Sequence, residues 1–137
     1  MFEEDLQEGE KIEEIVRIKL NNWWDCKLKK NPDKKDIDLI DDTHAIEIKY
    51  DRRYETTGNV AFEIYYKDKP SGISTTKATH IAYYLNDKIY VAPTHGLKKW
   101  LKENRDRYSI IVGGDNGYSK LALLKKWQFD EIFIRVP

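Results

Sequence analysis

The chain opens on a helical pattern of apolar and polar positions. Between Leu6 and Trp23, apolar residues recur at steps of three and four, and acidic residues occupy many of the positions between them. This period is that of an amphipathic α-helix with one side against a core. The sequence therefore predicts a helix over residues 3–22.

The pattern changes to strict alternation further along the chain. Residues 37–40 and 45–50 each fit a short β-strand, and the polar residues 41–43 fit a turn between them. Because successive side chains of a strand point to opposite faces, the second strand has one face of isoleucine and tyrosine. Its other face carries Glu47 and Lys49. The sequence therefore predicts a hairpin with one face in a core and charged groups on the other.

The rest of the chain mixes both patterns. Further strands are expected at residues 60–66, 80–85, 88–92, 108–112 and 132–136, a short strand or extended segment at 23–28, and a helix at 95–103 capped by Thr94. Hydroxyl residues before Lys77 are expected to cap another short helix, and residues 121–127 fit either a helix or a strand. Together these elements predict a single α/β domain in which helices flank a central mixed β-sheet.

Composition and charge limit the classes of function. At 137 residues the chain is long enough for one domain with a sizeable core. Lys and Arg number 24, as do Asp and Glu, so the net charge of zero provides no global attraction to nucleic acid or to an anionic membrane. Cys26 is the single cysteine, which excludes an internal disulfide and argues against a zinc cluster. With no apolar run long enough to cross a bilayer and no leader-peptide pattern, the expected location is a reducing cytoplasm.

The charged residues of the hairpin suggest a metal site. Asp36 and Asp38 share a face of the first strand, so Asp38 can lie opposite Glu47. Two carboxylates suit a hard divalent cation, to which the Ile48 carbonyl could add a third oxygen. Lys49 could then hold an attacking water or stabilise the charge that develops on a phosphate. The alternative is a plain surface hairpin with a Glu–Lys ion pair.

An Asp followed on the next strand by Glu-X-Lys resembles the core motif of the PD-(D/E)XK nuclease superfamily. The middle half of the chain also has Asp-Leu, Glu-X-Lys-X-Asp, Thr-Gly-Asn, a strand with a glutamate and Pro-Ser-Gly-Ile, in the order found in small phage-borne nucleases of this superfamily. The resemblance implies a restriction-endonuclease-like core that hydrolyses phosphodiester bonds in DNA with Mg²⁺, for which Mn²⁺ would substitute. It implies Asp38 and Glu47 as metal ligands and Lys49 as the catalytic lysine. A viral protein would act in the cytoplasm of its host cell.

A second motif concerns the first helix. Gly9 and Glu13 have the Gly-X-X-X-Glu spacing that opens nucleases of the Holliday-junction-resolvase type, which act as dimers. The resemblance implies that Glu13 is the helix carboxylate that completes the site and that the protein forms a homodimer on four-way junctions. A restriction-like or nicking endonuclease is the alternative within this class. Glu13 could equally belong to a solvated acidic face, and Glu10 or Glu14 could take its place.

Two further positions of the metal site stay open. No proline precedes Asp38 and the first strand is short, so Asp36 is an alternative ligand. Glu63 could be another metal ligand, orient a metal-bound water, or be an edge-strand charge that limits strand pairing.

Cationic and hydroxyl groups beside the hairpin are candidates for contact with the phosphate backbone of DNA. They are Arg52, Arg53, Lys69, Ser71 and Lys77, with the basic face of the 95–103 helix as a second candidate. The alternative class of function is a catalytically silent module that binds nucleic acid or protein on the same fold. The presence of Asp38, Glu47 and Lys49 together argues against a catalytically silent module. DNA, the substrate that the resemblance implies, is therefore the expected partner.

Overall fold

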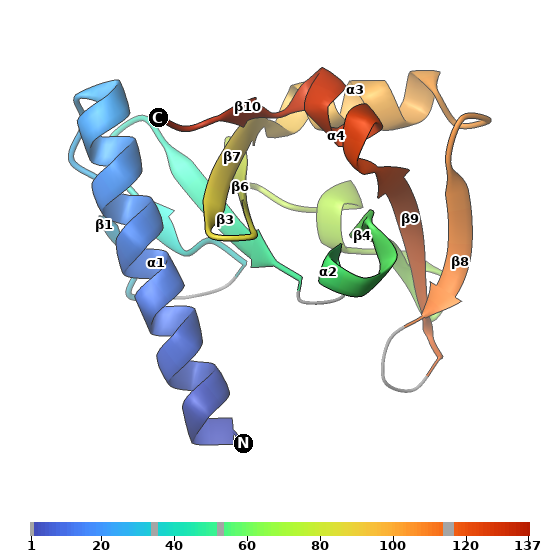
Figure 1. The fold of residues 1–137 in the computed structure, drawn as a ribbon, viewed down its shortest axis with the longest axis horizontal. Helices are drawn as coiled ribbons and strands as arrows, with labels where there is room; N and C mark the ends of the chain where they lie inside the picture. Colours follow the sequence, from blue (N-terminus) through green and yellow to red (C-terminus); the bar gives the residue numbers. More distant parts are fainter. Residues whose placement is uncertain (1, 34–35, 52–53, 114–116) are drawn as a thin grey trace.

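Ten strands are arranged in two sheets (Figure 1) in the computed structural model, which describes residues 2–33, 36–51, 54–113 and 117–137. The six-stranded sheet has the order β1 (Lys29–Lys30), β2 (Leu39–Ile40), β3 (Ala45–Tyr50), β6 (His80–Leu85), β7 (Lys88–Pro93) and β10 (Ile134–Arg135). The four-stranded sheet has the order β5 (Lys69–Pro70), β4 (Asn59–Tyr66), β9 (Ser119–Lys125) and β8 (Ser109–Gly113). Because β3 and β6 run parallel while the other pairs are antiparallel, the predicted single α/β domain with a mixed sheet is confirmed.

The helices cover the outer side and one end of the sheets. They are α1 (Phe2–Trp24), α2 (Tyr54–Thr57), α3 (Thr94–Glu103) and α4 (Lys126–Ile132), with a 3₁₀ turn, η1, at Gly72–Ser74. Figure 1 shows α1 on one side of the six-stranded sheet and the four-stranded sheet on its other side, with α3 and α4 along the top. Neither α1 nor any other helix in the described part of the chain is both long and apolar enough to span a membrane.

The first core lies between α1 and the six-stranded sheet. The apolar stripe of α1 is buried at Ile12, Val16 and Leu20, and it packs on Leu39 of β2 and Ile46 of β3. Because Leu39 and Ile46 are directly paired across the two strands, their side chains point to the same face. The face of β3 that carries Glu47 therefore points away from α1.

The second core fills the space between the two sheets and below α3 and α4. Its buried members include Val60 of β4, Leu124 of β9, Tyr83 of β6, Leu97 of α3 and Phe129 of α4. Strand β6 is thus buried on both faces, since Ala82 faces α1 while its neighbours face the second core. Glu47 of β3 lies on this inner side, which explains why a carboxylate in a short hairpin is buried.

The sequence predicted one sheet, whereas the structure has two. The strand expected at 60–66 is confirmed as β4, but it pairs with β9 and β5 and not with the hairpin. Alternation shows which residues of a strand are apolar but not which strand is its neighbour. Residues 121–127 divide between the strand β9 and the first residues of α4, so both alternatives hold for part of that segment.

Three local predictions were wrong. Trp23 and Trp24 continue α1 and do not begin an extended segment, and from this last turn Trp24 stacks on the ring of His44. Helix α3 begins at Thr94 itself, with Pro93 at the capping position and no side-chain cap. No helix begins at Lys77, since the described chain continues from there into β6; the hydroxyl of Thr76 instead accepts a hydrogen bond from the Ala78 backbone.

Removal of side-chain volume at Ile46 should destabilise the fold because this residue joins β3 to α1. Ile46 is fully buried, so Ile46→Ala is expected to lower the free energy of unfolding by about 2–5 kcal/mol. Ile134→Ala is the matched control: Ile134 is 61% exposed in the short edge strand β10, and its truncation should cost less than about 1 kcal/mol. Urea denaturation of both variants measures the difference, and equal losses would contradict the packing described here.

Candidate active site

Asp38 directly precedes β2, and its carboxylate takes the place of a neighbouring strand beside β3. The backbone N–H of Asp38 donates to the carbonyl of Ile46 at 2.8 Å, just outside the ladder in which Leu39 pairs with Ile46. One residue pair further along β3, the N–H of Ile48 donates to Oδ2 of Asp38 at 2.7 Å. A side chain therefore satisfies the β3 backbone where β2 has ended, and this bond holds the Asp38 carboxylate beside β3.

The chain before Asp38 lies outside the sheet, so β2 begins only at Leu39. Asp36 has a positive φ of 62°, a conformation that breaks an extended strand. Asn31 holds the resulting loop, since its side-chain amide donates to the carbonyl of Ile37 at 2.9 Å and its N–H donates to the carbonyl of Asp38 at 2.9 Å. The first strand is therefore shorter than predicted because its first two residues form a loop.

The Ile48 carbonyl points to the same edge as the Asp38 carboxylate. In a strand, the N–H and C=O of one residue point to the same side, and the N–H of Ile48 is directed at Asp38. The ladder between β2 and β3 reaches only as far as the Leu39–Ile46 pair, so β2 does not cover the edge of β3 at Ile48. The backbone oxygen that the sequence suggested as a third ligand is therefore directed to the Asp38 side of β3.

Glu47 is a buried carboxylate with other carboxylates nearby. Only 5% of its surface is exposed. Burial is the largest cause that raises the pKa of Glu47, and the charges of Asp36 and Asp38 raise it further, whereas the Lys49 ammonium and a hydrogen bond with Thr76 act in the opposite direction. The structure thus gathers negative charge on the inner side of the hairpin, where Asp38, Glu47 and Asp36 interact.

Lys49 brings a positive charge to the same face. Its Nζ lies 3.8 Å from Oε1 of Glu47, and its side chain is 50% exposed. The two side chains are two residues apart on β3 and point the same way. Lys49 can therefore contact Glu47 and also reach a molecule that approaches from solvent.

Glu13 lies on the other side of β2. It lines a groove between α1 and the strands β1 and β2, together with Arg17, Lys29, Lys30 and Leu39. Of the two neighbouring glutamates that the sequence offered as substitutes, Glu14 accepts hydrogen bonds from Arg17, one of them at 3.0 Å. The acidic residues that raise the pKa of Glu47 are Asp36 and Asp38. The described geometry thus associates Glu13 with Lys29 and Lys30.

Glu63 is held inside the four-stranded sheet. Its Oε1 accepts a hydrogen bond from the hydroxyl of Ser119 at 2.7 Å, and its Oε2 accepts one from Ser71 at 3.2 Å. A Cβ atom on Gly72 would lie 2.3 Å from the Glu63 carbonyl, so only glycine allows this close approach. Glu63 thereby anchors the loop 71–76, whose other end brings Thr76 to Glu47.

The residues expected to contact DNA are dispersed around this site. Lys69 is exposed on β5, and Lys77 is exposed next to Thr76, the hydrogen-bond partner of Glu47. The hydroxyl of Ser71 is already bonded to Glu63. Arg52 and Arg53 lie outside the described residues.

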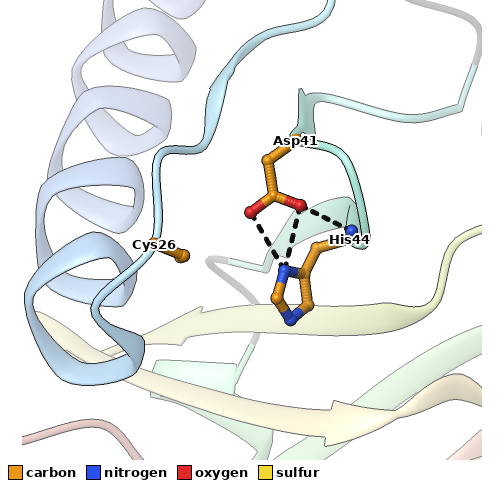
Figure 2. Close-up of side chains that lie close together, drawn as sticks. All are labelled: Cys26, Asp41 and His44. Carbon is orange, nitrogen blue, oxygen red and sulfur yellow. Dashed lines mark hydrogen bonds and ion pairs between the residues drawn. The ribbon is translucent and has the colours of Figure 1, made fainter.

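A different set of potential metal ligands lies at the turn of the same hairpin (Figure 2). In the described part of the chain, Cys26, Asp41 and His44 bring their ligand atoms within 4.8 Å of one another. His44 Nδ1 is 3.0 Å from each oxygen of Asp41, and burial is the main cause that raises the pKa of the Cys26 thiol. The sequence analysis missed this group because Cys26 is far from the other two in the chain; Asp41-X-X-His44 was the local signal.

Comparison of the chain with models of protein families, with curated proteins and with solved structures found no match. The interpretation of the site therefore depends on its geometry and chemistry. The residues that matter most are Asp38, Glu47 and Lys49, which β2 and β3 place together, and Thr76, which the sequence analysis considered only as part of a helix cap.

Protonation of Glu47 should make the stability of the fold depend on pH. Because its pKa is higher in the folded than in the unfolded protein, the folded state binds more protons between about pH 4.3, the ordinary glutamate value, and the higher folded pKa. The free energy of unfolding should therefore decrease as pH rises through this interval and stay lower above it. Glu47→Gln should lose this decrease and be more stable than the wild type at neutral pH.

Urea denaturation of both proteins between about pH 4 and about pH 8 measures this effect, because this range begins near the ordinary glutamate pKa and extends well above it. Lys49→Met provides the matched comparison, because loss of the ammonium removes a charge that lowers the pKa of Glu47. This variant should show a larger decrease in stability than the wild type. Parallel pH profiles for all three proteins would contradict the assignment.

Proposed function

We propose that the protein is a Mg²⁺-dependent DNA endonuclease of the PD-(D/E)XK type. The observation that carries this proposal is the hydrogen bond from the Ile48 N–H to Asp38 Oδ2, at 2.7 Å. It sets one carboxylate beside β3, next to the buried carboxylate of Glu47 and the Lys49 ammonium. An ordinary surface hairpin with an ion pair requires neither the buried glutamate nor the carboxylate that replaces a strand.

The donor set fits a hard divalent cation. Asp38 and Glu47 offer carboxylate oxygens, and the Ile48 carbonyl points to the same edge as Asp38. Mg²⁺ is typically bound by one or two carboxylates, with waters and substrate phosphates in the remaining positions. Burial is the main cause that raises the pKa of Glu47, and the charges of Asp36 and Asp38 raise it further; a bound cation would offset the repulsion that these two charges exert on Glu47.

A bound Mg²⁺ ion would polarise a phosphate oxygen and lower the pKa of a coordinated water. Within the chain, Asp38 has one fixed orientation because Oδ2 is tied to the β3 backbone. Glu47 has a hydrogen bond with Thr76, and its burial limits the access of water to its carboxylate. Lys49 is half exposed and therefore able to place its ammonium beside a phosphate, where it would stabilise charge in the transition state more than in the ground state.

DNA is the proposed substrate because cationic side chains near the carboxylates could bind its phosphate backbone. The chain has no net charge, so attraction to a phosphate backbone requires cations near the site. Lys77 is exposed and follows Thr76, the hydrogen-bond partner of Glu47, so it is the candidate for such a cation. A four-way junction cut by a homodimer is the proposed specific substrate, and duplex DNA cut by a restriction-like or nicking enzyme is the alternative.

Loss of the Lys49 ammonium should abolish cleavage with little effect on folding. Lys49→Ala removes one positioned charge, which typically costs on the order of a hundredfold or more in turnover. Lys88→Ala is the matched control, because Lys88 is an exposed lysine of the same sheet at the start of β7. Its turnover should remain near that of the wild type.

The assay compares supercoiled, linear, single-stranded and four-way-junction DNA, each with Mg²⁺, Mn²⁺ or EDTA. Cleavage should require the metal, and faster cleavage of junctions would favour the resolvase alternative. Wild-type turnover by Lys49→Ala would exclude the proposed role of Lys49. Binding of DNA without cleavage of any of these substrates would support a silent binding module on this fold.

Mg²⁺ or Mn²⁺ should also stabilise the folded protein. A ligand that binds only the folded state adds about 2.7 kcal/mol at a concentration of 100 times its Kd, so the melting temperature should rise. Asp38→Asn should lose most of this increase, although the Asn carbonyl can still accept the Ile48 N–H. Without metal this variant should be at least as stable as the wild type, because one of the charges that repel Glu47 is removed.

Thermal melts of both proteins with Mn²⁺ and with EDTA measure these changes. Asp42→Asn is the control, since Asp42 is an exposed acid in the turn of the same hairpin. An equal shift in all three proteins, or no shift in any of them, would contradict a metal site at Asp38.

A further inference from the structure

The end of α1 and the turn between β2 and β3 bring three different donor groups together. Cys26 follows α1, whereas Asp41 and His44 stand at the two ends of the turn. Figure 2 shows the Cys26 thiol, the Asp41 carboxylate and the His44 ring directed toward one another across the space between these segments. Their ligand atoms lie within 4.8 Å of one another, and the three residues are partly buried.

We propose that Cys26, Asp41 and His44 bind a borderline-soft divalent ion of the Zn²⁺ class, at a site separate from the carboxylates proposed to hold Mg²⁺. The inference goes beyond the proposed nuclease activity and does not depend on it. One thiolate, one imidazole and one carboxylate are each established donors to Zn²⁺. Thiolate and imidazole are softer than the oxygen ligands that Mg²⁺ requires, so this set selects the Zn²⁺ class over Mg²⁺.

The distances are near those that a tetrahedral ion needs. Zn–S and Zn–N or Zn–O bonds of about 2.3 Å and 2.1 Å place neighbouring donors roughly 3.3–3.6 Å apart. The Asp41–His44 pair is at 3.0 Å, so these two donors are already close to that spacing. For Cys26, a side-chain shift of about 1 Å closes the separation even at the 4.8 Å limit.

The structure holds each donor in position before any ion binds. Asn21 orders the segment that carries Cys26, because its side chain bonds both the N–H of Leu28, at 2.7 Å, and the carbonyl of Leu28, at 3.1 Å. The His44 ring stacks on Trp24 with centroids 4.9 Å apart and an interplanar angle of 19°. Fixed donors lose little conformational freedom on binding, which favours affinity.

Asp41 also has a structural task in the turn. Its Oδ1 accepts hydrogen bonds from the N–H groups of Thr43, at 2.8 Å, and His44, at 2.6 Å. These bonds explain the position of the carboxylate and its contact with His44 without a metal. The Cys26 thiol is held from the other side, by contacts with Asn21 Oδ1 at 3.3 Å and with the Leu20 carbonyl at 3.9 Å. The argument for a metal site is therefore the convergence of a thiol, a carboxylate and an imidazole within 4.8 Å.

Binding requires the thiol to lose its proton. The Cys26 thiol contacts Asn21 Oδ1 at 3.3 Å; on binding, the S–H bond breaks, the proton goes to solvent and a metal–sulfur bond forms without any change in oxidation state. Beside the ionised Asp41, His44 Nδ1 carries a proton. That proton also goes to solvent while Nε2 carries the one proton of the neutral ring, so that the Nδ1 lone pair can bind the ion. Asn21 Oδ1 keeps its bond from Leu28. The ion would then join the end of α1 to the hairpin that carries Asp38 and Glu47, with a fourth position left for water or another ligand.

The test uses Co²⁺ in place of Zn²⁺, because cobalt reports the identity of its ligands by absorption. Titration of the wild-type protein with Co²⁺ should produce a thiolate-to-cobalt charge-transfer band in the near ultraviolet that saturates at one equivalent. One equivalent of Zn²⁺ should remove the band, whereas excess Mg²⁺ should not. Cys26→Ser should lose the band, and Asp41→Asn and His44→Ala should bind Co²⁺ at least tenfold more weakly, which is the lower end of the effect of altering groups that only support metal ligands.

Two sets of controls separate this site from the rest of the molecule. His95→Ala removes an exposed histidine of α3 and should leave the titration unchanged. Asp38→Asn and Glu47→Gln should keep the cobalt band, so failure of the nuclease proposal and failure of this one are distinguishable. Asn at position 41 still offers a carbonyl to the N–H groups of the turn, and circular dichroism checks that each variant is folded.

The outcome that overturns the proposal is a folded wild-type protein without a charge-transfer band at saturating Co²⁺. A band that persists in Cys26→Ser would also overturn it. Equal affinity for Co²⁺ in the wild type and in His44→Ala would show that the imidazole is not a ligand, and would overturn the three-residue site. A second readout is the alkylation of Cys26 in the native protein, measured by mass spectrometry. Bound Zn²⁺ should protect Cys26 from the alkylating reagent, and this protection should be lost in His44→Ala.

Discussion

The hydrogen bond between the Ile48 N–H and the Asp38 carboxylate is the constraint around which the candidate site is organised. It completes the hydrogen bonding of β3 at the point where β2 ends, and so couples the position of a carboxylate to the backbone of the sheet. A backbone N–H buried without a partner is costly, so the bond favours one orientation of Asp38. Glu47 and Lys49 on the same strand then take fixed places relative to Asp38.

The two cores explain why the carboxylate of Glu47 is buried although it lies in a short hairpin. Leu39 and Ile46 pack on α1 with one face of the hairpin, so strand alternation directs Glu47 toward the second core, while Lys49 on the same face of β3 reaches solvent. The loop 71–76 then reaches from Glu63 to Glu47 through Ser71 and Thr76. Glu63, considered as a metal ligand from its position in the sequence, is thus engaged by two hydroxyl groups that tie this loop to β4 and β9.

The hairpin combines two kinds of donor chemistry at its opposite ends. Carboxylate oxygens gather at the end of β3 beyond β2, while a thiol, an imidazole and a carboxylate meet at the turn. The separation follows from the chain path, because α1 delivers Cys26 to the turn end only. Hard and borderline-soft ions would therefore be sorted by ligand type, without competition for the same residues.

The sequence by itself determined the elements whose signals are local. The helical period predicted α1, alternation predicted β3, β4, β6 and β7, and the spacing of Asp38, Glu47 and Lys49 indicated a shared face. The tertiary structure alone decided which strands are neighbours, the bond from Ile48 to Asp38, the contact of Thr76 with Glu47 and the approach of Cys26 to His44. The physical reason is that periodicity records which side of an element is apolar, whereas partners distant in sequence are selected by packing of the completed cores.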